Sequence, residues 1–210
     1  MSENEQVLIA SLPSGKLQAS DYELTSTPMP EAGANEVLVR TTAFAITAGT
    51  RAGLQGSASY AGAPTTGVVM NGTGVGEVVA SEHPDFSPGD RVLGPTGWQR
   101  FSVHAGKALS RLDPALDPIH YLGPLGVNGL TAYFGLFDVG APKPGETVMV
   151  SAAAGSVGHL VGQMAKIRDA RVVGVCGSDE KGALLMNELG FDATANYKNP
   201  DFRAALKEAT

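Results

Sequence analysis

The segment from Glu146 to Lys166 constrains the fold most, because its apolar pattern changes period in the middle. Thr147 to Val150 is a short β-branched, apolar run that follows the turn Pro144-Gly145, and it predicts a buried strand. From Val157 onward, apolar residues recur at the helical spacing i, i+3, i+4, i+7 and i+8. The segment therefore predicts a strand that passes through a tight turn into an α-helix.

The turn between them, Ala153 to Gly158, matches the pattern G-x-G-x-x-G with alanine at the first position. In that geometry Gly155 lets a pyrophosphate approach the backbone, and Gly158 lets the helix pack close to the strand. Free N–H groups at the start of the helix, including those of Ser156 and Val157, would face the phosphates. By itself the turn is weak evidence, since similar glycine turns occur in many proteins that bind no nucleotide.

A second predicted strand, Arg171 to Cys176, strengthens the interpretation as a nucleotide site. It ends roughly 20 residues beyond Gly155, where an NAD-binding fold places an Asp or Glu on the adenosine ribose. This chain instead has Gly177-Ser178 at that point. The missing carboxylate favours NADP over NAD.

The residues after this strand predict a helix that begins at Ser178 as its cap and ends near Gly190. Its expected inner face consists of Gly182, Leu185, Met186 and Leu189. Lys181 falls in the first turn, where the helix dipole disfavours a cation. We expect Lys181 to bind an anion there, namely the 2′-phosphate of NADP. The alternative is a surface lysine neutralised by Asp179 and Glu180.

Four motifs occur together and in order: Ala152 to Gly158, Gly177 to Lys181, Leu189 to Asp192 and Asn196 to Lys198. This set resembles the medium-chain dehydrogenase/reductase superfamily, in its zinc-independent branch of prostaglandin and leukotriene reductases, curcumin reductase and alkenal double-bond reductases. The resemblance covers nearly the whole chain. It implies an α/β protein with a GroES-like β-rich catalytic domain, residues 1–124. The rest, residues 125–210, would be the first half of a Rossmann-type doubly wound parallel sheet that binds NADPH.

The first part of the chain supports a β-rich domain without the resemblance. Short β-rich runs separated by Gly, Pro and polar turns predict a barrel or sandwich. The runs are Gln6–Ala10, Glu36–Arg40, Val75–Ala80, Asp90–Leu93 and Gln99–Val103. The resemblance sharpens this prediction to the GroES-like fold, and Trp98 is expected either in the core or in the wall of a pocket.

Composition excludes several classes of protein. A formal charge of −6, a pI of about 5.2 and 43% apolar residues are typical of a soluble globular protein. There is no basic patch for nucleic acid, no run of ~18 apolar residues for a membrane span and no secretion signal at the amino terminus. We therefore expect a cytoplasmic protein that binds neither nucleic acid nor a membrane.

The sequence offers no recognisable metal site. Cys176 is the only cysteine, and it is expected to pack at the end of a strand rather than react. The four histidines are scattered without ligand spacing and are interpreted as structural or surface residues. The stretches 43–48 and 67–70, where zinc-bearing relatives carry their ligands, contain none of the right chemistry, so we expect no metal.

The resemblance also assigns roles to three further residues. Tyr60 matches a tyrosine of the curcumin reductase group, which implies a hydroxyl that binds the substrate carbonyl or protonates an enolate; the alternative is an ordinary loop tyrosine. Thr131 would lie beside the nicotinamide, and Tyr197 would approach the adenosine phosphate. A helix-face threonine and a strand-end tyrosine with no such role would look the same.

The activity implied is NADPH-dependent reduction of the C=C bond of α,β-unsaturated aldehydes or ketones, with hydride transfer to the β-carbon and without zinc. A quinone oxidoreductase is one alternative. A non-catalytic relative that binds a dinucleotide or a partner is another, because Ala48 to Arg51 and Asn71 depart from the pattern of the branch near its expected substrate site.

The number of predicted strands bears on completeness. Only 147–152, 171–176 and 193–197 are predicted in the second domain, whereas a complete dinucleotide fold has about six strands. We therefore expect the chain to be part of a longer enzyme, which the resemblance implies is a homodimer. The 210 residues alone are expected to be inactive.

Overall fold

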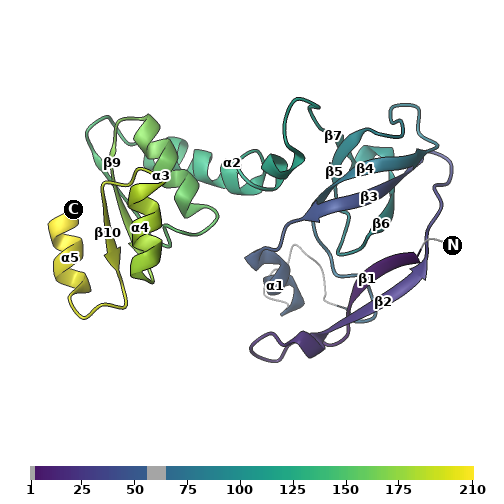
Figure 1. Cartoon of the computed structure of the whole chain (residues 1–210), viewed down its shortest axis with the longest axis horizontal. Coiled ribbons are helices and arrows are strands. Elements are labelled where there is room, and N and C mark those ends of the chain that lie inside the picture. Colours follow the sequence, from purple (N-terminus) through teal and green to yellow (C-terminus); the bar gives the residue numbers. More distant parts are fainter. Residues whose placement is uncertain (1–2, 56–64) are drawn as a thin grey trace. The chain divides into compact units, whose positions relative to one another are not determined.

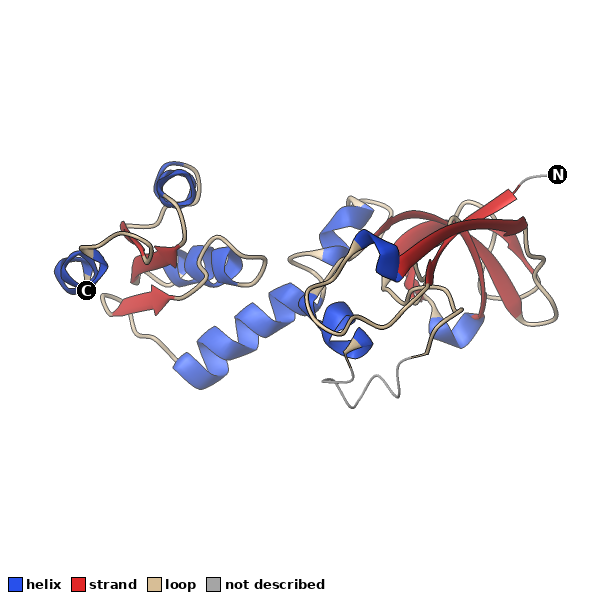
Figure 2. Ribbon diagram, turned by 90° about the horizontal axis from the view of Figure 1, so that it is seen from below, coloured by secondary structure: helices blue, strands red, loops and turns tan. Residues whose placement is uncertain are grey.

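A computed structural model describes residues 3–55 and 65–210 of the chain. They form two compact units, Met1–Leu122 and Gly123–Thr210. Figure 1 labels their elements along the chain. Strands are the main regular elements of the first unit, whereas helices flank a parallel sheet in the second (Figure 2).

The first unit is built on a five-stranded antiparallel sheet with the order β6-β3-β4-β5-β7. Its strands are β3 (Glu36–Phe44), β4 (Gly74–Ser81), β5 (Arg91–Gly94), β6 (Phe101–Ala105) and β7 (Ser110–Arg111). Alternate residues of β3, Val37 and Val39, are fully buried and pack with Val78 and Val92 from the neighbouring strands. Leu38, which lies between Val37 and Val39, is buried as well, so both faces of the sheet are covered at this part of β3.

A separate hairpin pairs β1 (Glu3–Ile9) with β2 (Tyr22–Pro28) along their whole length. Single bridges join β1 to Gln99 and to Val69. Short helices complete the unit: η1 (Ala19–Asp21), α1 (Ala48–Leu54), η3 (Gly106–Ala108) and η4 (Pro118–Leu122). Each of the five predicted β-rich runs overlaps a strand, whereas β2, β7 and α1 were not predicted.

The second unit contains a three-stranded parallel sheet with the order β10-β9-β8. The strands are β8 (Thr147–Val150), β9 (Arg171–Cys176) and β10 (Ala193–Asn196). The helices are α2 (Val127–Phe134), the π-helical η5 (Gly135–Gly140), α3 (Gly158–Ile167), α4 (Asp179–Asn187) and α5 (Phe202–Ala209). The crossover α3 packs on β8 and β9, and α4 packs on β9 and β10. This is the β-α-β-α-β half of a doubly wound sheet, so the predicted α/β fold is confirmed.

Three local predictions for this unit were wrong in detail. Strand β8 ends at Val150 rather than at residue 152, and Met149 is 53% exposed because β8 lies at an edge of the described sheet. The sequence also predicts a single helix over residues 128–137, but this helix changes to π geometry after Phe134. On α4, Gly182 and Leu185 are buried as predicted, but Met186 is 42% exposed.

In the part of the chain that the structure describes, no helix combines the length and the apolar character needed to cross a membrane.

Candidate functional site

The candidate site lies along one edge of the parallel sheet in the second unit. Because β8, β9 and β10 run in the same direction, their carboxyl ends meet at a common edge. In open α/β sheets, ligands bind at this edge. The loop before α3, the dipeptide Gly177-Ser178 and Tyr197 all follow directly from these strand ends.

The turn after β8 has no room for side chains at its two glycines. A Cβ on Gly158 would lie 2.5 Å from the Ala152 carbonyl oxygen and 2.9 Å from the Ala153 Cα atom. A Cβ on Gly155 would lie 3.0 Å from the same carbonyl oxygen, which already accepts a hydrogen bond from the Gly155 N–H at 2.8 Å. The Ala153 N–H donates to the Val175 carbonyl oxygen at 3.0 Å, which ties the turn to β9.

The start of α3 presents free hydrogen-bond donors. Among the described residues, no acceptor is found for the backbone N–H groups of Ser156, Val157 and Gly158. Ser156 is exposed, and no side chain caps this end of the helix. Unpaired N–H groups at a helix start, together with the helix dipole, favour binding of an anion.

The loop after β9 places a cation at the same edge. The Ser178 hydroxyl oxygen accepts a hydrogen bond from the Lys181 backbone N–H at 3.4 Å, so Ser178 caps α4 as predicted. The Lys181 side chain is exposed, and within the described chain its ammonium group forms no ion pair or hydrogen bond. Lys181 is therefore available to bind a negatively charged ligand.

The two acidic neighbours of Lys181 are engaged elsewhere. The Asp179 carboxylate accepts hydrogen bonds from the Asn196 and Asn199 side-chain amides, at 2.8 Å and 3.4 Å. The pKa of Glu180 is lowered by hydrogen bonds from its own backbone N–H and from the Ser178 hydroxyl. The alternative interpretation, in which these carboxylates neutralise Lys181 directly, finds no ion pair in the described part of the chain.

Tyr197 completes this group from the end of β10. Its backbone N–H donates to the Cys176 carbonyl oxygen at 3.0 Å. Its hydroxyl lies against Gly177, where a Cβ would be 2.7 Å from the hydroxyl oxygen, and the residue is 56% exposed. Ser178, Lys181 and Tyr197 thus gather around the loop after β9, next to the glycine turn.

Two other predicted site residues are less informative. Thr131 is exposed on α2, and its hydroxyl donates to the Val127 carbonyl oxygen at 2.6 Å. Nothing in the second unit by itself tests its expected position beside a nicotinamide. Tyr60, the predicted catalytic residue, lies outside the described residues.

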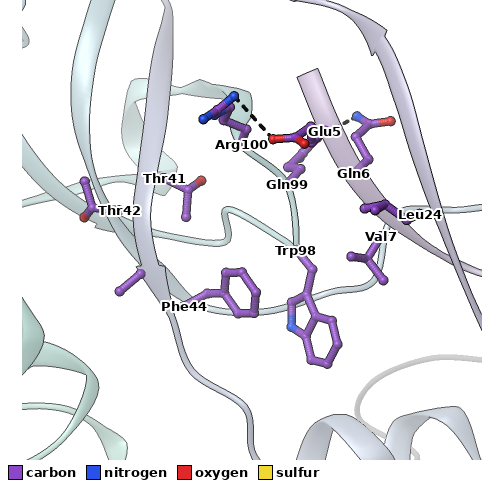
Figure 3. A pocket seen from close by; sticks show the side chains of 11 residues that line it. Glu5, Gln6, Val7, Leu24, Thr41, Thr42, Phe44, Trp98, Gln99 and Arg100 are labelled. Carbon is purple, nitrogen blue, oxygen red and sulfur yellow. Dashed lines mark hydrogen bonds and ion pairs between the residues drawn. The ribbon is translucent and has the colours of Figure 1, made fainter. Parts of the chain in front are cut away.

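Trp98 lines a pocket in the first unit and also packs in a core cluster. Its ring stacks on Tyr22 and Phe44, with centroid distances of 5.5 Å and 5.3 Å. On one side the ring contacts the buried cluster of Ile9, Leu54 and Met70. On another it borders a pocket of about 330 Å³ (Figure 3). The predicted alternatives for Trp98, core or pocket wall, therefore both apply.

Two domain families match the chain. Residues 5–112 match the family described as N-terminal domain of oxidoreductase, and residues 156–210 match the one described as zinc-binding dehydrogenase. The chain belongs to the medium-chain dehydrogenase/reductase superfamily. Within this superfamily, its relatives place it in the branch of prostaglandin, curcumin and alkenal reductases.

Several relatives are similar to this chain along almost its whole length. The NADPH-dependent curcumin reductase of Escherichia coli (strain K12) is 39% identical over 98% of the chain, and the NADP-dependent 2-alkenal reductase of Nicotiana tabacum is 39% identical over 97%. The crystal structure of CurA from Vibrio vulnificus in complex with NADPH has a TM-score of 0.89 at 36% identity and covers 97% of the chain. The chain spans 60%, 62% and 61% of these proteins, respectively.

The segments expected to depart from the pattern of the branch lie in the first unit. Ala48 to Arg51 form the first turn of α1, which is capped by the Thr47 hydroxyl. Arg51 and Asn71 are both exposed.

No three His, Cys, Asp or Glu side chains gather as metal ligands within residues 3–55 and 65–210. The absence of zinc stays a prediction. Cys176 is buried, and its thiol donates to the Ser178 carbonyl oxygen at 3.4 Å.

Sequence reasoning missed three residues at the site. Asn196 and Asn199 hold the Asp179 carboxylate, and the His159 ring nitrogen Nδ1 lies 2.7 Å from the Gly155 carbonyl oxygen. Asn196 belongs to the motif Asn196 to Lys198, but a sequence motif does not indicate the direction in which a side-chain amide points. His159 follows Gly155 by four residues, and this spacing was the one available signal.

Proposed function

We propose that the protein is an NADPH-dependent reductase of the C=C bond of α,β-unsaturated aldehydes or ketones. The observation that carries this proposal is that, within the described residues, three N–H groups at the start of α3 lack an acceptor and the Lys181 ammonium at the same sheet edge lacks a partner. The curcumin and alkenal reductases among the relatives support both the cofactor and the substrate class.

The residues present fit the cofactor. The N–H groups of Ser156, Val157 and Gly158 would bind its pyrophosphate. Ser178, Lys181 and Tyr197 would bind the 2′-phosphate, whose negative charge would pair with the Lys181 ammonium. The Asp179 carboxylate is oriented by the Asn196 and Asn199 amides and forms no ion pair with Lys181 in the described chain.

A bound NADPH supplies the hydride, so the protein has to orient the reactants and stabilise charge on the carbonyl oxygen. By resemblance, Thr131 borders the nicotinamide, and the Tyr60 hydroxyl donates a hydrogen bond to the substrate carbonyl. Such a donor lowers the barrier because it meets the negative charge that develops as hydride reaches the β-carbon.

The cofactor assignment is tested by Lys181→Ala. Removing a charge-assisted contact to the 2′-phosphate should weaken NADPH binding by roughly five- to fiftyfold and leave NADH binding nearly unchanged. Titration calorimetry with both nucleotides measures this difference. Lys143→Ala is the matched control. Lys143 is also exposed, but it precedes β8 and therefore lies near the amino ends of the strands, away from the candidate site. Equal losses for the two nucleotides would refute the assignment.

The catalytic assignment is tested by Tyr60→Phe. Loss of the hydroxyl should lower the turnover rate by roughly tenfold or more, while the dissociation constant for NADPH stays the same. Steady-state kinetics with an alkenal measures the rate. Tyr121→Phe is the control, since the Tyr121 hydroxyl accepts a hydrogen bond from the Asp113 N–H. An unchanged rate in Tyr60→Phe would show that Tyr60 only packs.

A second candidate is a non-catalytic relative that binds the dinucleotide or a partner, which the departures at Ala48 to Arg51 and at Asn71 favour. Turnover assays with NADPH and either an alkenal or a quinone discriminate among the possibilities. Faster reduction of the alkenal supports the proposed function, and faster reduction of the quinone indicates a quinone oxidoreductase. Cofactor binding without turnover of either compound indicates the non-catalytic relative.

A further inference from the structure

We propose that His159 is a positioning residue for the glycine turn. Its imidazole N–H holds the Gly155 carbonyl group and thereby aims the Ser156 N–H at the pyrophosphate of the cofactor. This inference rests on the proposed function, since it concerns the same nucleotide site.

The hydrogen bond between the ring and the turn fixes the tautomer of His159. The ring nitrogen Nδ1 lies 2.7 Å from the Gly155 carbonyl oxygen. A carbonyl oxygen only accepts hydrogen bonds, so Nδ1 has to carry the proton. The His159 backbone N–H donates to the same oxygen at 3.1 Å. One residue therefore supplies both donors to this carbonyl group.

This pair of hydrogen bonds also sets the direction of the next N–H group. Across a planar trans peptide bond, the C=O of one residue and the N–H of the next point in opposite directions. With the Gly155 carbonyl turned toward His159, the Ser156 N–H points away from the helix. That N–H has no acceptor in the described chain, and Ser156 is exposed.

Gly155 is the position at which such an anchor matters most. Glycine has no Cβ to restrict its backbone, so the peptide between Gly155 and Ser156 can rotate more freely than others. A rotated peptide would present a carbonyl oxygen, instead of an N–H, to a phosphate. The imidazole bond favours the orientation that binds the anion.

The proposed role predicts a different pattern of losses from that of Lys181. The pyrophosphate is common to NADPH and NADH, so a variant that removes the imidazole donor from the Gly155 carbonyl should weaken the binding of both nucleotides by the same factor. Lys181→Ala, in contrast, should affect NADPH alone.

The test compares His159→Ala with His159→Ser in the intact protein by titration calorimetry with NADPH and NADH. Serine can donate its hydroxyl to the carbonyl four residues earlier, whereas alanine cannot. We expect His159→Ala to weaken both nucleotides by roughly two- to tenfold, the range for one neutral hydrogen bond. His159→Ser should stay within about twofold of the wild type. Neither substitution removes a helix former on which α3 depends.

Gln163→Ala is the matched control. The Gln163 side chain donates to the His159 carbonyl oxygen at 3.1 Å, which is the same spacing one turn further from the glycine turn. This variant should bind both nucleotides as the wild type does.

The possible results distinguish failure of the positioning role of His159 from failure of the proposed function. Equal affinities in the wild type and His159→Ala would overturn the positioning role alone. The same conclusion would follow if serine failed to restore binding, or if only NADPH were weakened. A wild-type protein that bound neither nucleotide would overturn the proposed function itself.

Discussion

Gly158 shows how strictly a single position controls the candidate site. Its missing side chain lets α3 approach the backbone of Ala152 and Ala153, and both contacts are with atoms that cannot move aside easily. The sequence pattern predicted this requirement for Gly158, because glycine at the end of G-x-G-x-x-G has a known packing role.

Gly158→Ala should therefore destabilise the second unit by about 1–3 kcal/mol and weaken NADPH binding, because the turn has to shift to admit the methyl group. Thermal unfolding and calorimetric titration measure the two effects. Gly135→Ala is the control: Gly135 is helical, and nothing lies within 4 Å of its added Cβ. That variant should be neutral or more stable by up to about 1 kcal/mol. If both variants behaved alike, the close approach at Gly158 would not matter.

At the same scale, the sequence predicted the residue types at the site better than the directions of their side chains. Ser178 was predictable as a cap because its residue type and position determine the bond. The spacing of four residues allows the bond from His159 to Gly155, but it does not determine the rotamer that forms it. The bonds from Asn196 and Asn199 to Asp179 depend in addition on the approach of a distant segment.

At the scale of elements, strands with an apolar pattern were predicted and polar ones were not. Strand β2 pairs with β1 over seven residues, yet its Leu24 is 76% exposed and its remaining residues are mostly polar. Its stability comes from the hydrogen bonds of the hairpin rather than from an apolar face, so its sequence carries little signal. By contrast, β9 has three buried residues in succession, and its bounds were predicted to the residue.

Asp192 connects three elements of the second unit and gives a prediction about pH. Its carboxylate precedes β10 and accepts hydrogen bonds from the Val172 N–H at 2.6 Å and from the Lys166 ammonium at 2.9 Å. Burial opposes ionisation of Asp192, but the hydrogen bonds from Val172 and Lys166, together with the charges of Lys166 and Arg171, lower its pKa overall.

A pKa below the unfolded value of about 3.9 means that the ionised carboxylate stabilises the fold above about pH 5. This contribution is lost as the pH falls through the folded pKa. Asp192→Asn should lower the unfolding midpoint by about 2–4 °C at pH 7, for about 1 kcal/mol, and the difference from wild type should shrink toward pH 3. Asp138→Asn, which removes a carboxylate without a partner in the described chain, is the control. A difference that did not change with pH would contradict this assignment.

For the whole molecule, each unit has its own buried core. The first contains two clusters, one around Val37 and Val39 and one around Ile9, Leu54 and Met70. The second contains a cluster around Val172 and Leu185. The β-rich first half and the α/β second half were predictable because each has its own periodicity. The GroES-like fold of the first half was implied by the family resemblance alone.

Residues 1–122 alone should therefore unfold in a single cooperative transition, because their core is complete within that range. Residues 123–210 should be less stable, since their smaller sheet leaves Met149 exposed at its edge. Scanning calorimetry of the two pieces and of the intact chain tests both statements. A first piece without a transition would show that its fold depends on the second.

The aromatic stack of Tyr22, Trp98 and Phe44 has a further consequence for experiments. Trp98 is the only tryptophan in the chain, and it belongs to the first unit. Intrinsic fluorescence excited at the indole therefore reports on the first unit alone. Its emission during unfolding therefore follows the loss of the fold of the first unit and not that of the second.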